Sequence, residues 1–293
     1  MTWGRRTAVT LLRLAIVVMT MRAVAEPVPS VHWLVVDFPP YEIHGGPDTG
    51  NGLMDRYLLS LTQRLPQFQH TIDVVGFQRR DALMKTTQPS CTVSRFSTPD
   101  RARYAVFAEH PFMYLLPPRL VATQKVAEPL RSALDHDALP LTQIMNTGQY
   151  ALGIYPARHF GDAIDHQLDE IRASNPAAIK DYRETGASSI IDLLNIMAQG
   201  AFDMTLAYTV EGEYLRHTQP ALPVLEYFPI AGATNLLPLH ISCNKTEVGL
   251  AVMQAVDKLG VHDAAALQAQ HDFEGLLPQD EKRRYEALLL KAK

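Results

Sequence analysis

The sequence predicts an α/β protein with two lobes that are joined by two crossing strands. Strand-like and helix-like segments alternate through residues 31–109, and the alternation starts again over residues 150–208. Such alternation favours a layered sheet with helices on its faces. Two extended stretches, residues 116–124 and 236–244, follow the two blocks. Two crossings of this kind imply two lobes.

The first block begins with VHWLVVDFPPYEI, residues 31–43, a β-rich run that leads into a loop stiffened by two prolines. Residues 52–66 place apolar side chains three and four positions apart, which is typical of an amphipathic helix that ends near Pro66. The short strand TIDVVGF and a short helix near residues 80–86 follow. This order predicts a parallel arrangement of the first strands.

The segment CTVSRFSTPDRARYAVFAEHPF, residues 91–112, contains two runs with the alternation of half-buried strands. A tight hairpin would prefer Asn-Gly or Asp-Gly between them. The sequence instead has hydroxyl residues, a proline and an arginine. These residues suit one helical turn whose backbone N–H groups and guanidinium face an anion.

The second block contains a strand and a helix in residues 150–168, then a helix, a glycine stop and a strand in residues 188–208. After the second crossing, TEVGLAVMQAVDKLG at residues 246–260 predicts a helix that ends at Gly260. We expect residues 26–120 to form the first part of lobe 1, residues 121–238 to form lobe 2, and residues 239–293 to return to lobe 1.

Residues 1–25 have the features of a secretory signal peptide that is cleaved before Glu26. Arg5 and Arg6 precede an apolar run, and Ala23-Val24-Ala25 offers small residues at the cleavage site. The alternative is a membrane anchor, but the run is short and Arg13 interrupts it, whereas a span needs about 20 apolar residues. We therefore expect a periplasmic protein.

Charge argues against nucleic acid as a partner. The full chain has 27 Lys and Arg against 31 Asp and Glu residues, and the signal segment holds four Arg and no acid, so the mature chain carries a net charge of −8. The chain contains no HExxH, GxSxG or Cys-x-x-Cys motif. The run at 135–137, Asp-His-Asp, suits a solvated turn better than a metal site. We predict no metal, no cofactor and no enzymatic activity.

Several motifs in this order resemble the extracellular solute-binding proteins of family 3, which have the type II periplasmic binding fold. The motifs are DFPPYEI, GLMDRYLLSLTQRL, Thr98-x-x-Arg101 followed by YAVFAEHPF, and Gly200-x-x-Asp203 at the end of a helix. The resemblance covers nearly the whole mature chain. It implies a ligand cleft between two lobes that close about a hinge.

The resemblance implies that Arg101 holds a carboxylate of the ligand through a charge-assisted contact; the alternative is a surface salt bridge or a helix cap. Thr98 either touches the ligand or only caps the turn. Tyr41 either lines the cleft mouth or packs as a loop aromatic. Asp203 is expected to be structural, at the turn between helix and strand.

Two positions depart from the family pattern. YPARHF replaces a small hydroxyl-rich loop, so Arg158 becomes a ligand contact or a solvated side chain. Tyr208 stands where amino-acid binders usually have an acid for the ligand's ammonium, and a phenol supplies no such charge. Glu211 substitutes for that acid only if the strand end bends; a surface glutamate is the simpler interpretation. An α-amino acid is therefore a less secure ligand than another anionic metabolite.

Cys91 and Cys243 are either two small buried side chains or a disulfide, which an exported protein can keep. The resemblance favours the disulfide, because it places the returning strand antiparallel beside the third strand of lobe 1. We expect a monomer that binds a small molecule and passes it to a membrane permease or signals to a membrane receptor. A dehydratase-like enzyme on the same fold is a further alternative, because fold alone does not decide function.

Overall fold

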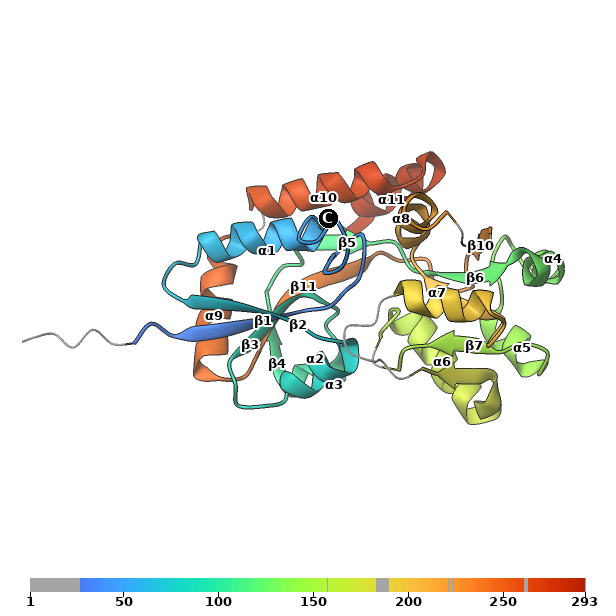
Figure 1. Ribbon diagram of the computed structural model, residues 1–293, viewed down its shortest axis with the longest axis horizontal. Helices are drawn as coiled ribbons and strands as arrows, with labels where there is room; N and C mark the ends of the chain where they lie inside the picture. Colours follow the sequence, from blue (N-terminus) through green and yellow to red (C-terminus); the bar gives the residue numbers. More distant parts are fainter. Residues whose placement is uncertain are drawn as a thin grey trace, which may run out of the picture.

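A computed structural model describes residues 27–156, 158–182, 190–220, 222, 224–260 and 263–292. The predicted signal peptide, residues 1–25, lies outside these ranges. The fold is two-lobed and mixed α/β, with one sheet in each lobe (Figure 1). The predicted fold class is thus confirmed. None of the described helices is long and apolar enough to cross a membrane.

The sheet of lobe 1 has the strand order β2-β1-β3-β11-β4, and β5 also pairs with β11. Strands β1, β2 and β3 are parallel, as the alternation predicts, whereas β11 runs antiparallel to β3, β4 and β5. The strands are β1 (Ser30–Val35), β2 (Gln69–Val74), β3 (Ser90–Arg95), β4 (Ala105–Phe107), β5 (Met113–Leu115) and β11 (Leu237–Asn244).

The helices of lobe 1 pack an apolar core against this sheet. Helix α1 buries Met54, Tyr57, Leu58 and Leu61, which the spacing of apolar residues predicts. Helix α10 lies beside α1, and the last helix, α11, begins near α8 (Thr209–Thr218) and runs back toward lobe 1, where the chain ends (Figure 1). The helices are α1 (Leu53–Gln63), α2 (Phe77–Leu83), α3 (Pro99–Ala102), α9 (Glu247–Asp257), α10 (Ala264–Leu276) and α11 (Gln279–Ala292).

The sheet of lobe 2 has the order β10-β6-β9-β7-β8, and apolar clusters cover both of its faces. Its strands are β6 (Arg119–Thr123), β7 (Leu152–Ile154), β8 (Ile179–Asp181), β9 (Met204–Ala207) and β10 (Leu225–Phe228). Its helices are α4 (Gln124–Ser132), α5 (Leu141–Asn146), α6 (Asp162–Ser174), the 3₁₀ turn Pro176–Ala178, α7 (Ile190–Ala198) and α8 (Thr209–Thr218).

The chain crosses between the lobes twice. It leaves lobe 1 after β5 and enters the lobe-2 sheet at β6, and it returns from β10 to β11 (Figure 1). Glu281 of α11 adds a third link, because its carboxylate pairs with Arg119 of β6 and accepts a hydrogen bond from the Thr209 hydroxyl at 3.0 Å. These crossings place the end of β3 and helix α3, both in lobe 1, opposite the start of α8 in lobe 2.

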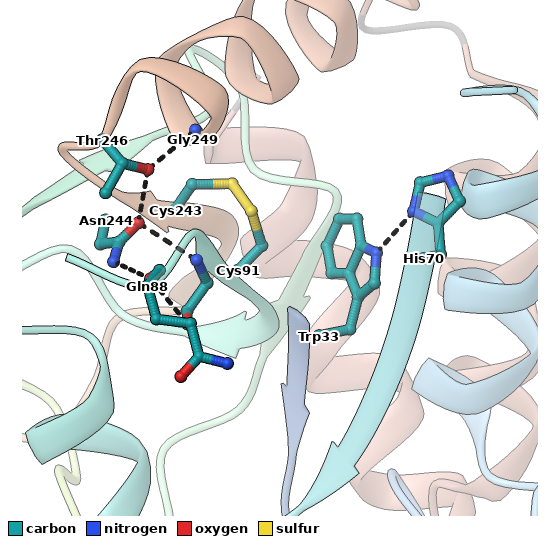
Figure 2. Close-up of a disulfide and its surroundings, with 9 residues drawn as sticks. Trp33, His70, Gln88, Cys91, Cys243, Asn244, Thr246 and Gly249 are labelled. Carbon is teal, nitrogen blue, oxygen red and sulfur yellow. Dashed lines mark hydrogen bonds between the residues drawn. A yellow bond between two sulfur atoms is a disulfide. The ribbon is translucent and has the colours of Figure 1, made fainter. Parts of the chain in front are cut away.

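The predicted disulfide is present between Cys91 and Cys243. The two cysteines are register partners on the antiparallel strands β3 and β11. Figure 2 shows the bond beside the Asn244 side chain, whose amide donates to the Gln88 carbonyl at 2.6 Å. Thr246 caps α9 by accepting from the Gly249 N–H at 3.1 Å. The bond therefore ties the returning strand β11 to lobe 1 near the start of β3. Phe96 lies at the opposite end of that strand.

Candidate functional site

A small cavity lies between the two lobes, where β3 ends and α8 begins. It leaves about 30 Å³ for the centres of water-sized molecules, so it has room for a few water molecules. The lining residues are Phe38, Phe77, Arg80, Ser94, Phe96, Arg101, Leu115 and Leu239 from lobe 1 and Arg158, His159 and Tyr208 from lobe 2.

Arg101 lies on the lobe-1 wall of this cavity, at the end of the predicted helical turn. Thr98 caps that turn, because its hydroxyl accepts from the Arg101 N–H at 3.3 Å. The Arg101 guanidinium donates through Nη1 to the Phe96 carbonyl at 3.2 Å and lies 4.0 Å from Asp81. Its Nε–H is buried without a partner. Arg101 thus has donor capacity left over on the cavity side of the protein.

Arg80 is a second lobe-1 arginine at the cavity, and sequence analysis did not identify it. Its Nη1 donates to the carbonyl and hydroxyl oxygens of Ser94 at 3.2 and 2.8 Å, and its Nε is buried without a partner. Its only sequence signal is the pair Arg79-Arg80 beside Asp81 on the short helix α2. Arg80 turns inward because it packs against Ser94 of β3, which lies 14 residues further along the chain. Local sequence does not show which arginine of the pair does so.

Arg95 brings a third guanidinium to the same region. It forms an ion pair with Asp81 at 2.8 Å, without hydrogen-bond alignment, and donates to the Tyr104 hydroxyl at 2.6 Å. Burial, and then the neighbouring Arg95, lower the pKa of Arg101 to about 9. Arg101 is therefore still protonated at neutral pH. Lobe 1 thus gathers three guanidinium groups, of which Arg95 and Arg101 lie near Asp81 and Arg80 interacts with the buried Glu42.

The lobe-2 wall is organised by the ion pair between Arg158 and Glu211. Arg158 donates through Nη2 to both carboxylate oxygens, at 3.0 and 2.9 Å, and the side chains are only 4% and 0% exposed. The Tyr208 N–H donates to the same carboxylate at 2.5 Å, at the start of α8. Burial raises the pKa of Glu211, while Arg158 opposes that rise. The expectation of a surface Glu211 is wrong, and burial excludes the solvated one of the two alternatives for Arg158.

Arg158 also contacts three aromatic rings. Its guanidinium carbon lies 4.8 Å from the centre of the Phe38 ring in lobe 1, 5.4 Å from Phe160 and 5.6 Å from Tyr208. A guanidinium at these distances is attracted by the negative face of a ring. The contact with Phe38 crosses the cleft, so it holds the two walls together.

The structure brings Arg101, Arg158 and Tyr208 together at the cavity, but Tyr41 and Thr98 are not among its lining residues. Tyr41 is fully buried behind the wall, with its ring centre 4.7 Å from Phe38 and 5.9 Å from Tyr208. Phe273 of α10 lies 6.2 Å away on its other side. Tyr41 is thus a packed loop aromatic that supports the rings facing the cavity.

Two further expectations concern acidic residues away from the cavity. Asp203 accepts the Ala151 N–H at 2.8 Å, so it fixes the turn between α7 and β9, as predicted. The side chains of Asp135 and His136 are 73% and 96% exposed, as in a solvated turn. Within the described ranges, no three His, Cys, Asp or Glu side chains gather as a metal site would require.

A second, larger cavity of about 260 Å³ lies nearby, at the start of α6. Phe96 lines both cavities. The larger one is formed mainly by residues 160–164 and by residues 232–238, which precede and begin β11. A rotation of the Phe96 ring would therefore change the space available to both.

No protein-family model and no curated protein sequence matches the chain. Solved structures do match. The putative L-cystine ABC transporter from Listeria monocytogenes is 12% identical with a TM-score of 0.56, over 83% of this chain and 95% of that one. An arginine 3rd transport system periplasmic binding protein from Legionella pneumophila is also 12% identical, with a TM-score of 0.56 over 84% and 99% of the chains.

A third match is the periplasmic VFT2 domain of BvgS from Bordetella pertussis, which is 16% identical with a TM-score of 0.53 over 82% of this chain and 93% of that one. Identities this low establish the fold and not the ligand. The chain therefore has the type II periplasmic binding fold, which transport proteins and sensor domains share.

Proposed function

We propose that this protein is a solute-binding protein that captures a small carboxylate-bearing anion between its two lobes. The observation that supports this most directly is the state of Arg80 and Arg101. Both line the interlobe cavity, and both keep a buried Nε–H that has no protein partner. Buried donors are nearly always paired, so an anionic ligand is the natural partner for these two groups.

Each site residue has a proposed role. Arg101 binds a carboxylate of the ligand, and Arg80 supplies a second charged donor from α2. Thr98 positions Arg101 through the cap of α3. Tyr208 and Arg158 form the opposite wall, and Tyr41 supports Phe38 and Tyr208 from behind.

Binding is proposed to close the lobes about the two crossings. Lobe 1 would comprise residues 26–120 and 239–293, and lobe 2 residues 121–238, so that both boundaries fall within the crossing strands β6 and β11. The lining of the cavity supports this motion, because side chains of both lobes form it, and a change in the distance between the lobes would open or close it. Ligand would enter the open form and be enclosed by Phe38 and Arg158.

The protein is proposed to act in the periplasm as a monomer, after removal of residues 1–25. Its membrane partner is either a permease, for uptake, or a signalling receptor, for sensing. Co-purification from membranes with each candidate partner, with and without ligand, distinguishes these roles. We propose no catalytic role for the site.

Substitution of Arg101 tests the proposal. A thermal-shift panel of carboxylates, amino acids, polyamines and aromatic compounds on the mature protein should identify carboxylate ligands. Arg101→Ala should weaken their binding by a few kcal/mol, about 100-fold, because a charge-assisted contact in a closed cleft is lost.

Arg103→Ala is the matched control. Arg103 lies two residues on, pairs with Asp100 at 2.5 Å, and is 73% exposed. It should bind the same ligands as the unsubstituted protein does. Equal binding by Arg101→Ala and Arg103→Ala would contradict the assignment of Arg101.

A further inference from the structure

We infer that the cleft selects carboxylates that carry no ammonium group, because lobe 2 already places a cation of its own in the cleft. The inference rests on the proposed function and names the class of ligand. That class comprises 2-oxo acids, 2-hydroxy acids and dicarboxylates without an amino group. It excludes α-amino acids.

The part of the cavity lining that the structure describes contains no carboxylate that could accept hydrogen bonds from a ligand ammonium. A buried ammonium is costly unless a carboxylate or several neutral oxygens receive its three N–H groups. Among the described residues that line the cavity, none is an Asp or a Glu. An ammonium in this cavity would therefore face guanidinium groups without a carboxylate in contact.

Glu211 is the buried carboxylate just behind the lobe-2 wall. Both of its oxygens accept from Arg158, and one also accepts from the Tyr208 N–H. Arg158 stands between this carboxylate and the cavity lining. Recruiting Glu211 for a ligand would strand the Arg158 charge in a buried position, which costs several kcal/mol.

Arg158 also covers the aromatic surface that could otherwise hold a cation of the ligand. The faces of Phe38 and Tyr208 attract a positive group, and the Arg158 guanidinium already lies 4.8 and 5.6 Å from their ring centres. The Arg158 side chain thus already occupies the aromatic faces that a ligand ammonium could otherwise use. The unpartnered donors of Arg80 and Arg101 still favour an anion.

Matched ligand pairs test this inference on the mature protein. Isothermal titration compares pyruvate and lactate with alanine, malate with aspartate, and 2-oxoglutarate with glutamate. In at least one pair, the acid without nitrogen should bind at least tenfold more tightly than the amino acid with the same carbon skeleton. The members of a pair share their carboxylates, so the ratio measures the effect of replacing the ammonium with a ketone or a hydroxyl.

An amino acid that binds as tightly as its partner in every pair, or more tightly, overturns the inference. If that binding still depends on Arg101, the proposed solute-binding function stands. If no member of any pair binds, both the inference and the carboxylate proposal fail. The two failures are therefore distinguishable.

Substitution of Arg158 gives a second test that does not depend on the affinity for any one ligand. Arg158→Met removes the built-in cation and exposes Glu211, so the ratio within a pair should shift toward the amino acid by at least tenfold. The double variant that combines Arg158→Met with Glu211→Gln lacks the Glu211 carboxylate, so its ratio should show no such shift. A shift of equal size in both variants would contradict the role of Glu211.

Arg172→Met is the control for these variants. Arg172 lies on α6 and pairs with Asp181 at 2.9 Å on the surface, with 35% of its side chain exposed. It should leave the ratio unchanged. If Arg158→Met does not fold, the matched pairs on the unsubstituted protein still decide the inference.

Discussion

The two walls of the cleft both contain buried arginines, yet they treat the charge differently. On the lobe-2 wall, Arg158 is neutralised by Glu211 through two hydrogen bonds. On the lobe-1 wall, Arg95 and Arg101 share the carboxylate of Asp81, Arg80 interacts with the buried Glu42, and each arginine keeps an unpartnered N–H group. Since a buried unpaired charge is unfavourable, the lobe-1 wall carries a cost that a bound anion would relieve.

This difference indicates which wall serves stability and which serves binding. When one partner of a fully hydrogen-bonded buried ion pair is removed, the protein loses much stability, because the other charge is left buried without a partner. A cluster of arginines with too few counter-charges loses little stability when one arginine is removed. An anionic ligand would stabilise such a cluster most.

Glu211→Gln should have the largest effect, on the lobe-2 wall. Glutamine keeps the shape of the side chain but leaves Arg158 without a counter-charge. We expect the free energy of unfolding to fall by about 3–5 kcal/mol, measured by urea denaturation at pH 7. Glu213→Gln is the control: Glu213 pairs with Arg216 on the surface of the same helix, and its loss should cost at most about 1 kcal/mol.

Glu42 adds a pH-dependent effect behind the lobe-1 wall. Burial raises the pKa of Glu42 to about 7, although Arg80 and the Val36 N–H oppose the rise. Because the folded-state pKa lies above the unfolded value, proton binding stabilises the fold. That stabilisation is complete below about pH 4.5 and is lost as the pH rises through 7, a change of roughly 2–3 kcal/mol between pH 5 and pH 8.

Glu42→Gln should remove this part of the pH dependence. The free energy of unfolding of the unsubstituted protein should fall more steeply from pH 5 to pH 8 than that of the variant, as measured by urea denaturation at both pH values. Glu109→Gln, at an exposed position, should keep the slope of the unsubstituted protein. Identical slopes for Glu42→Gln and the unsubstituted protein would show that Glu42 does not titrate in this range.

Arg101→Met should have the smallest effect on stability, even though Arg101 is as buried as Arg158. It removes one hydrogen bond to the Phe96 carbonyl and relieves repulsion from Arg95. We expect the free energy of unfolding to change by less than about 1 kcal/mol, whereas Arg158→Met should cost about 3–5 kcal/mol. Comparable losses in the two variants would remove the contrast between the walls.

The order of strands and helices was predictable because its signals are local. In residues 91–112, alternation gives β3 and β4, and the Thr98 cap and Pro99 give the turn between them. The Cys91–Cys243 pair followed once β11 was placed beside β3. The helices α10 and α11 were not predicted as elements, although they complete the core of lobe 1.

The walls of the site were harder to predict, because their chemistry depends on partners far apart in sequence. Glu211 lies in a polar stretch that suits an exposed helix, and its partner Arg158 is 53 residues away. The direction of the Tyr41 ring depends on Phe273 of α10. Whether an arginine faces solvent or a cavity cannot be read from local periodicity.

The disulfide has a topological consequence. Cys91 and Cys243 are separated by 152 positions, so the bond closes the intervening chain into a covalent ring that contains every strand of the lobe-2 sheet. A protease that cuts once inside this ring linearises it without releasing a fragment, and the nicked molecule keeps both lobes in one covalent piece. Only a second cut, or reduction of the bond, lets a fragment leave.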